Sequence, residues 1–208
     1  MNEASYRRSA WTTAGCLFTA LAFAMGLTHL AVAHMVSSSQ DSGIQMASPD
    51  ANHASNSNMA IGFYTSPGQD HRVLMQFDLA AYAGQPVNSA TLYLYRHYTY
   101  GSSASTVNIH RVTRPWTETG VTWNSADTGT AWTAAGGDYA ATPSASTALP
   151  GTGFDWYSWD ITDLVEDWID GTHSNHGLLI KQSTYGSRTY AGYYSRESGT
   201  NPAYLELD

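Results

Sequence analysis

Cysteine is almost missing from this chain of 208 residues, which has only Cys16, close to its N-terminus. If the segment around Cys16 is removed, disulfides, cysteine–zinc sites, thiolate nucleophiles and iron–sulfur clusters are all excluded. Lysine and arginine are also scarce, with 9 against 17 aspartates and glutamates and a formal net charge of −8. This charge argues against a nucleic-acid partner, which needs a cationic surface, and against adhesion to an anionic membrane.

Long apolar runs are absent as well. The mostly apolar stretch at residues 14–27 is shorter than the roughly 20 residues that cross a bilayer. It follows Arg7 and Arg8 and precedes residues 31–33, whose sequence Ala-Val-Ala has the small-x-small pattern of a signal-peptidase site. Residues 1–33 are therefore expected to be a signal peptide, which would make the protein secreted, extracellular and free of the membrane after cleavage. Retention of this segment as an anchor remains the alternative.

Charged residues make up 12% of the chain, about half the usual share of a globular domain. Tyr, Thr, Ser, Gly and Asn take their place, and these residues favour pleated surfaces and turns. The composition is typical of an exported all-β domain. Residues 34–43 are polar and are expected to form a flexible leader, and residues 44–208 are expected to form one domain.

Alternating apolar residues predict several strands, among them residues 72–79 and 89–100. Residues 126–153 are rich in Ala, Gly, Thr and Ser and are expected to be a long loop with one weak strand. One short α-helix is predicted by the apolar spacing from Ile161 to Trp168, with Asp160 at its start and Gly171 after its end. The predicted core contains Val73, Met75, Phe77, Leu92, Leu94, Val107, Ile109, Ile161, Leu164, Trp168 and Ile180.

Several segments together resemble one known family. They are HRVLMQFDL (71–79), VNSATLYLY (87–95), VTRPWTETGVTWN (112–124), WDIT followed by Trp168 (159–168), GLLIK (177–181) and SRE (195–197). In this order they are similar to the motifs of the DNRLRE domain family, also described as carbohydrate-binding module family 96. The resemblance spans roughly residues 41–208 and implies a secreted β-sandwich of the jelly-roll type, often appended to polysaccharide lyases or other extracellular proteins.

The chemistry-bearing residues do not form a convincing active site, since the chain has no nucleophile elbow, zinc-protease motif or phosphate-binding loop. Glu118 and Arg196 lie in the family motifs and are expected to make structural contacts, and Trp116 and Trp123 are expected in the core. His173 and His176 have a spacing that could hold a metal, but no further ligand lies nearby in sequence. No catalytic residue, metal ligand or cofactor is therefore predicted, although a structural calcium ion remains open.

A row of polar rings is the better candidate for a binding site. Tyr93, Tyr95 and His97 alternate with the apolar positions of their strand, so they point away from the core unless a second sheet or the helix covers them. Tyr190 and Arg188 of a later strand are expected nearby, and Arg188 and Arg96 could supply a local positive charge for an acidic sugar. The predicted ligand-binding residues are Tyr93, Tyr95, His97, Arg188 and Tyr190.

These observations favour a secreted, non-catalytic carbohydrate-binding domain that recognises an extracellular polysaccharide or oligosaccharide. A structural subunit of an extracellular matrix or filament is the first alternative, in which the polar leader would add a strand to a neighbouring copy. A small polysaccharide lyase is the second, because tyrosine and histidine are abundant.

Overall fold

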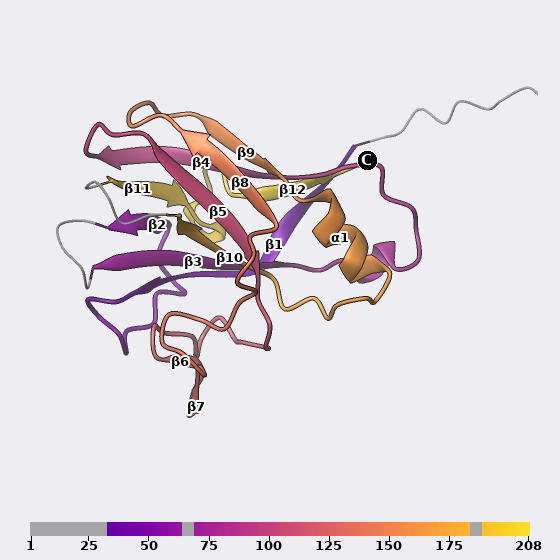
Figure 1. Cartoon of the computed structure of the whole chain (residues 1–208), viewed down its shortest axis with the longest axis horizontal. Helices are drawn as coiled ribbons and strands as arrows, with labels where there is room; N and C mark the ends of the chain where they lie inside the picture. Colours follow the sequence, from indigo (N-terminus) through magenta and orange to yellow (C-terminus); the bar gives the residue numbers. More distant parts are fainter. Residues whose placement is uncertain (1–32, 64–68, 184–188) are drawn as a thin grey trace, which may run out of the picture. The chain divides into compact units, whose positions relative to one another are not determined.

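Strands dominate the residues that the computed structural model describes, which are 33–63, 69–183 and 189–208 (Figure 1). The expected signal peptide lies outside these described residues, except for Ala33. The described part has twelve strands, one α-helix and two 3₁₀ turns, which confirms the predicted all-β class with one short helix. In chain order the elements are β1 (His34–Gln45), β2 (Asn58–Phe63), β3 (Asp70–Phe77), η1 (Ala80–Tyr82), β4 (Ala90–Tyr100), β5 (Ser105–Arg111), β6 (Ser125–Asp127), β7 (Thr130–Ala131), β8 (Ala145–Leu149), β9 (Trp156–Asp160), α1 (Thr162–Ile169), β10 (Leu178–Gln182), β11 (Thr189–Tyr194), η2 (Arg196–Ser198) and β12 (Tyr204–Leu207).

The strands form two antiparallel layers that β1 joins. In one layer β4 lies between β9 and β12, and residues 34–37 of β1 pair with β12. In the other layer residues 38–45 of β1 pair with β3, which continues through β10 and β5 to β8. The strands β2 and β11 connect β3 back to β4. Figure 1 shows β4, β9 and β12 on one side and β3 on the other, which is the predicted jelly-roll type β-sandwich.

The expectation that residues 34–43 form a flexible leader is wrong, because they make up most of β1. Their side chains are polar, but strand pairing uses backbone groups and needs no apolar side chain. Ser38, Asp41 and Ser42 are buried at the point where β1 passes between the layers. Because this segment pairs with strands of its own chain, it is not the free donor strand that the filament hypothesis assumed.

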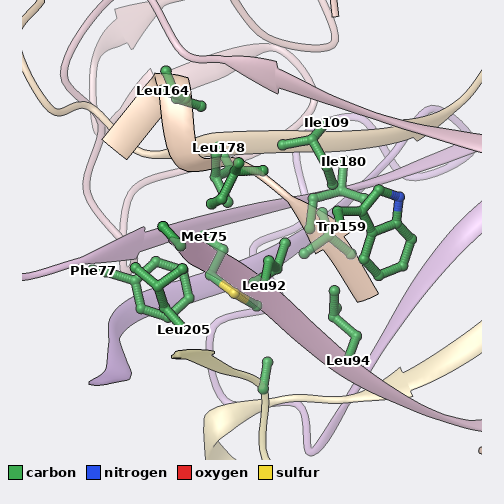
Figure 2. Packing of buried hydrophobic residues seen from close by; sticks show 14 of the residues in the cluster. Met75, Phe77, Leu92, Leu94, Ile109, Trp159, Leu164, Leu178, Ile180 and Leu205 are labelled. Atoms are coloured by element: carbon green, nitrogen blue, oxygen red, sulfur yellow. The ribbon is translucent and has the colours of Figure 1, made fainter. Parts of the chain in front are cut away.

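The main core lies between the layers. Met75 and Phe77 of β3 point toward Leu92 and Leu94 of β4, and all four side chains are at most 1% exposed (Figure 2). The core residues predicted from alternation and from the helical spacing all belong to this one cluster. The alternation on which the strand prediction rests is thus confirmed, and it fixes which side of β4 faces away from the core.

A second, smaller core covers the other side of β1, β3 and β10. Leu74 of β3 and Leu179 of β10 pack there with tryptophans of the segment 112–140, among them Trp116 and Trp123. Both rings are 5% exposed, which confirms that they are core residues. The segment also contributes the β6–β7 pair, and β8 follows it as the weak strand expected between residues 126 and 153.

The helix α1 lies at one end of the main core, where its apolar stripe is buried (Figure 1). The Asp160 carboxylate accepts a hydrogen bond from the Thr162 backbone N–H at 3.0 Å, which satisfies one of the free donors of the first turn. Gly171 has a φ of +76° just beyond the last turn, a conformation that glycine adopts without strain. The predicted end of the helix at Gly171 is confirmed, whereas the N-cap position belongs to Ile161 and the predicted cap, Asp160, lies one residue before it.

Candidate functional site

Several aromatic rings gather on the side of β4 that faces away from the core. Leu92 and Leu94 are fully buried, and Tyr93 and Tyr95, which alternate with them, are half-buried. Rings from three neighbouring strands stand beside these tyrosines. We call the group the aromatic face, and it consists of Tyr93, Tyr95 and His97 of β4, Trp156 of β9, Tyr194 of β11 and Tyr204 of β12.

The rings of the aromatic face hold one another in place. Tyr93 stacks on Tyr204 with 4.9 Å between ring centroids and 15° between ring planes. His97 stacks on Tyr194 at 4.3 Å and 14°. The Trp156 ring contacts two other rings edge-on, with 5.4 Å between its centroid and that of Tyr95 and 5.2 Å to that of Tyr204. Because their orientations are fixed in this way, the rings lose little conformational freedom when a ligand binds.

A bulge in β4 positions His97. Gly192 of β11 pairs with Tyr98, whereas the next residue, Tyr193, pairs with Arg96, so His97 is the extra residue. A Cβ atom on Gly192 would lie 3.2 Å from Nε2 of His97, and the missing side chain therefore gives the imidazole its place. The bulge also leaves Tyr98 44% exposed beside His97.

A cleft of about 610 Å³ lies next to the aromatic face. We call it the histidine cleft, because its lining includes His53, His71 and His97 together with Tyr98 and Tyr190. The Tyr190 ring contacts His71 edge-on at 4.9 Å and Tyr98 at 6.1 Å. Since His97 belongs to both groups of residues, the aromatic face leads into the histidine cleft.

The three histidines of the cleft favour the neutral form. Burial lowers the pKa of His53, of His71 and of His97 below the ordinary value of 6.5. One ring nitrogen of each is buried without a hydrogen-bond partner among the described residues, namely Nε2 of His53, Nδ1 of His71 and Nε2 of His97. A neutral imidazole offers one donor and one acceptor and carries no charge, so the lining of the cleft suits an uncharged ligand rich in hydroxyl groups.

We expect the stability of the protein to fall on acidification, in part through His71. Burial lowers the pKa of His71, a smaller effect of Asp70 raises it, and His53 lowers it further. The unfolded chain takes up its proton first, so this stability is fully present above about pH 6.5 and is lost as the pH falls toward the folded-state pKa. Denaturant titrations at about pH 7.5 and 5.5 should show a smaller loss for His71→Gln than for the wild type, and equal losses would contradict the assignment.

The predicted ligand-binding residues divide into three groups. Tyr93, Tyr95 and His97 lie together on the aromatic face, where neighbouring rings account for part of their burial. Tyr190 lies in the histidine cleft instead. Arg188 lies outside the described residues. The sequence reasoning missed Trp156, Tyr204, His53 and His71, because their position beside β4 depends on strand pairings between distant segments.

Arg96 is not available as a positive spot for an acidic sugar. It is 2% exposed, and its guanidinium group donates hydrogen bonds of 2.8 Å to the backbone carbonyls of Pro150, Thr152 and Gly153. Its carbon also lies 4.3 Å from the ring centroid of Tyr157. Arg96 therefore fastens the segment before β9 to the inner side of β4.

A second hollow of about 1000 Å³ lies beside the segment 133–143. His110, Arg114, Tyr139 and Lys181 line it, and Arg114 forms an ion pair with Asp138 at 3.2 Å. The ammonium group of Lys181 lies 5.6 Å from the ring centroid of Tyr139. This hollow carries cationic groups and fewer rings than the aromatic face, so it is the rival site for an acidic sugar.

The family-motif residues Glu118 and Arg196 make structural contacts, as expected. Oε1 of Glu118 accepts a hydrogen bond from the Asp41 backbone N–H at 2.8 Å, and its Oε2 pairs with Arg196 at 2.7 Å.

Within the described part of the chain, the histidine pair His173 and His176 is not in a group of three residues that could share a metal ion. That pair therefore carries no metal assignment.

The sequence profile of carbohydrate-binding module family 96 matches residues 33–208, which include all the strands and the helix described above. The chain belongs to this family. Membership of this family implies that the partner of the module is a carbohydrate. No curated protein matches the chain significantly. None of the helices in the described residues is long and apolar enough to cross a membrane.

Proposed function

We propose that this family 96 module is a secreted, non-catalytic domain that binds an extracellular polysaccharide on the aromatic face and in the histidine cleft. The observation that carries the proposal is the set of mutually stacked rings on the outward side of β4, with His97 shared between the face and the cleft. Aromatic rings stack on the C–H faces of sugars, and tyrosine hydroxyls and imidazole nitrogens bond to sugar hydroxyls.

The arrangement suits a chain of sugars better than a single sugar. Tyr93, Tyr95 and His97 follow one another at every second residue of β4, which spaces them by about 7 Å along the strand. The cleft extends this row sideways toward β3, where His71 lies. A ligand that contacts both the face and the cleft must therefore be extended.

Charge favours an uncharged glycan. The chain carries a net charge of −8, and the histidines of the cleft favour the neutral form. An anionic polysaccharide would be repelled at long range unless it bound in the second hollow beside Lys181 and Arg114. The variant Lys181→Ala therefore separates the two sites, because it should leave binding to a neutral glycan unchanged.

A glycan array probed with the purified protein tests the function itself. We expect retention on one or more neutral polysaccharides and weaker retention on acidic ones. Release of an unsaturated product, followed by its ultraviolet absorbance, would indicate a lyase instead. Absence of binding to every glycan, combined with self-assembly in solution, would favour the structural alternative.

Export is a separate part of the proposal. Its supports are the pattern of residues 1–33, the start of β1 at His34 and the start of the family match at residue 33. Mass spectrometry of protein recovered from the medium should find an N-terminus at His34 or within a few residues of it. A full-length cytoplasmic species as the sole product would contradict it.

A further inference from the structure

Three carboxylates from distant parts of the chain meet at the bend of β1. Asp41 comes from β1, Glu118 from the segment that forms the second core, and Glu197 from η2. One carboxylate oxygen of each residue lies within 4.8 Å of those of the other two. Oxygen ligands of one calcium ion stand 2.3–2.6 Å from it, so oxygens this close together can share a common centre.

Positive charge at this cluster is insufficient to balance it. Arg196 is the cation in contact with it, with Nη2 2.7 Å from Oε2 of Glu118 and Nε 3.0 Å from Oε1 of Glu197. Its Nη1 donates instead to the backbone carbonyl of Ser39. Three ionised carboxylates against one guanidinium group leave a formal charge of −2 in a partly buried place.

Asp41 supplies a second and independent observation. Its side chain is 1% exposed, and Oδ2 accepts hydrogen bonds from the Ser38 hydroxyl at 2.9 Å and the Arg196 backbone N–H at 3.1 Å. The other oxygen, Oδ1, is buried and accepts no hydrogen bond from the described residues. A buried carboxylate oxygen without a partner is costly, because it has lost its hydration without compensation.

We propose that Asp41, Glu118 and Glu197 bind one calcium ion, with water completing its coordination on the exposed side. The donor set consists of oxygen only, which suits a hard cation and disfavours zinc, which prefers nitrogen and sulfur ligands. Magnesium requires shorter bonds of about 2.0–2.1 Å in a strict octahedron, whereas three carboxylates from three separate segments suit the more flexible coordination of calcium better. Glu197 has 25% of its side chain exposed, which leaves room for water ligands.

The ion would tie together β1, the covering segment of the second core and the turn before β12. Polar contacts join these parts at the cluster, such as the one between Glu118 and the Asp41 backbone. Calcium would therefore act on the stability of the fold, away from the carbohydrate site. With three protein ligands and water, the dissociation constant is expected in the range of about 10⁻⁴–10⁻³ M that is typical of extracellular modules.

Calcium titration of the chelator-treated protein tests this site. Isothermal titration calorimetry should show one calcium ion bound, with weaker binding of magnesium. At ten times the dissociation constant the melting temperature should rise by about 3–6 °C. No calcium binding at millimolar concentrations would overturn the proposal.

Variants separate a specific site from general charge screening. Asp41→Asn keeps an oxygen for the hydrogen bonds of Oδ2, removes one charge, and should abolish the calcium-dependent rise in melting temperature. Asp163→Asn on the exposed side of α1 is the matched control and should respond to calcium like the wild type. If Asp41→Asn does not fold, Glu197→Gln replaces it, with Glu166→Gln as its control. Equal responses of the wild type and these site variants would overturn the proposal.

Discussion

Replacing Tyr93 and Tyr95 together by alanine is expected to abolish retention of the protein on its glycan while the protein still folds. Central aromatic contacts in binding sites cost about 2 kcal/mol or more each when truncated, so the double variant should bind about three orders of magnitude more weakly. The loss should be this large because each ring also supports a partner, Tyr204 in one case and Tyr194 in the other. Affinity electrophoresis or calorimetry with the glycan from the array measures it.

The same double variant should lose a moderate amount of stability. Both tyrosines are half-buried, and each ring pair that disappears contributes about 0.5–1.5 kcal/mol. A suitable control is Tyr82→Ala, which truncates another half-buried tyrosine, one that packs against the main core away from the aromatic face. This control should lose stability and keep its affinity. A double variant that folds and still binds normally would remove the aromatic face from the proposal.

Phe77→Ala is expected to lower the free energy of unfolding by about 3–5 kcal/mol, the usual cost of truncating a buried aromatic side chain. Phe77 is 1% exposed and lies beside Met75 and Leu205 in the main core (Figure 2). Alanine in its place would leave a cavity that packed strands can close only in part. Urea denaturation followed by tryptophan fluorescence measures the change.

Phe154→Ala is the matched control for this prediction, because the same truncation occurs at a side chain that is 61% exposed. Its free energy of unfolding should change by less than about 0.5 kcal/mol. A loss below about 1 kcal/mol for Phe77→Ala would mean that the neighbouring side chains repack to fill the space.

Alternation of side chains predicted the main core well, because each strand there has one buried side that a single sequence reveals. It failed where both sides of a strand are buried. Leu74 and Leu179 occupy the positions that alternation assigns to solvent, and the tryptophan-rich segment 112–140 covers them. Because the covering segment has no regular alternation, nothing in the local sequence indicates that the second side of β3 and β10 is buried.

Polar composition misled the prediction for β1, since serine and glutamine are typical of mobile segments and also tolerate strand pairing.

The candidate site was predicted to the extent that it lies on one strand. Tyr93, Tyr95 and His97 are found by counting along β4. Trp156 and Tyr204 require the registers of β9 and β12 against β4, which only the folded chain provides.

The pairing of β1 with β12 has a consequence for the order in which the domain folds. His34 pairs with Leu207, so strands about 170 residues apart must meet before the layer that contains β4 is complete. Contacts this distant in sequence carry a high loop-closure entropy and slow the folding of β-rich domains. The four residues of β12 leave the ribosome long after β1, and until then β1 has no partner in that layer. In the exported protein that we propose, the chain would therefore stay open while it is threaded across the membrane and would close only after β12 has emerged.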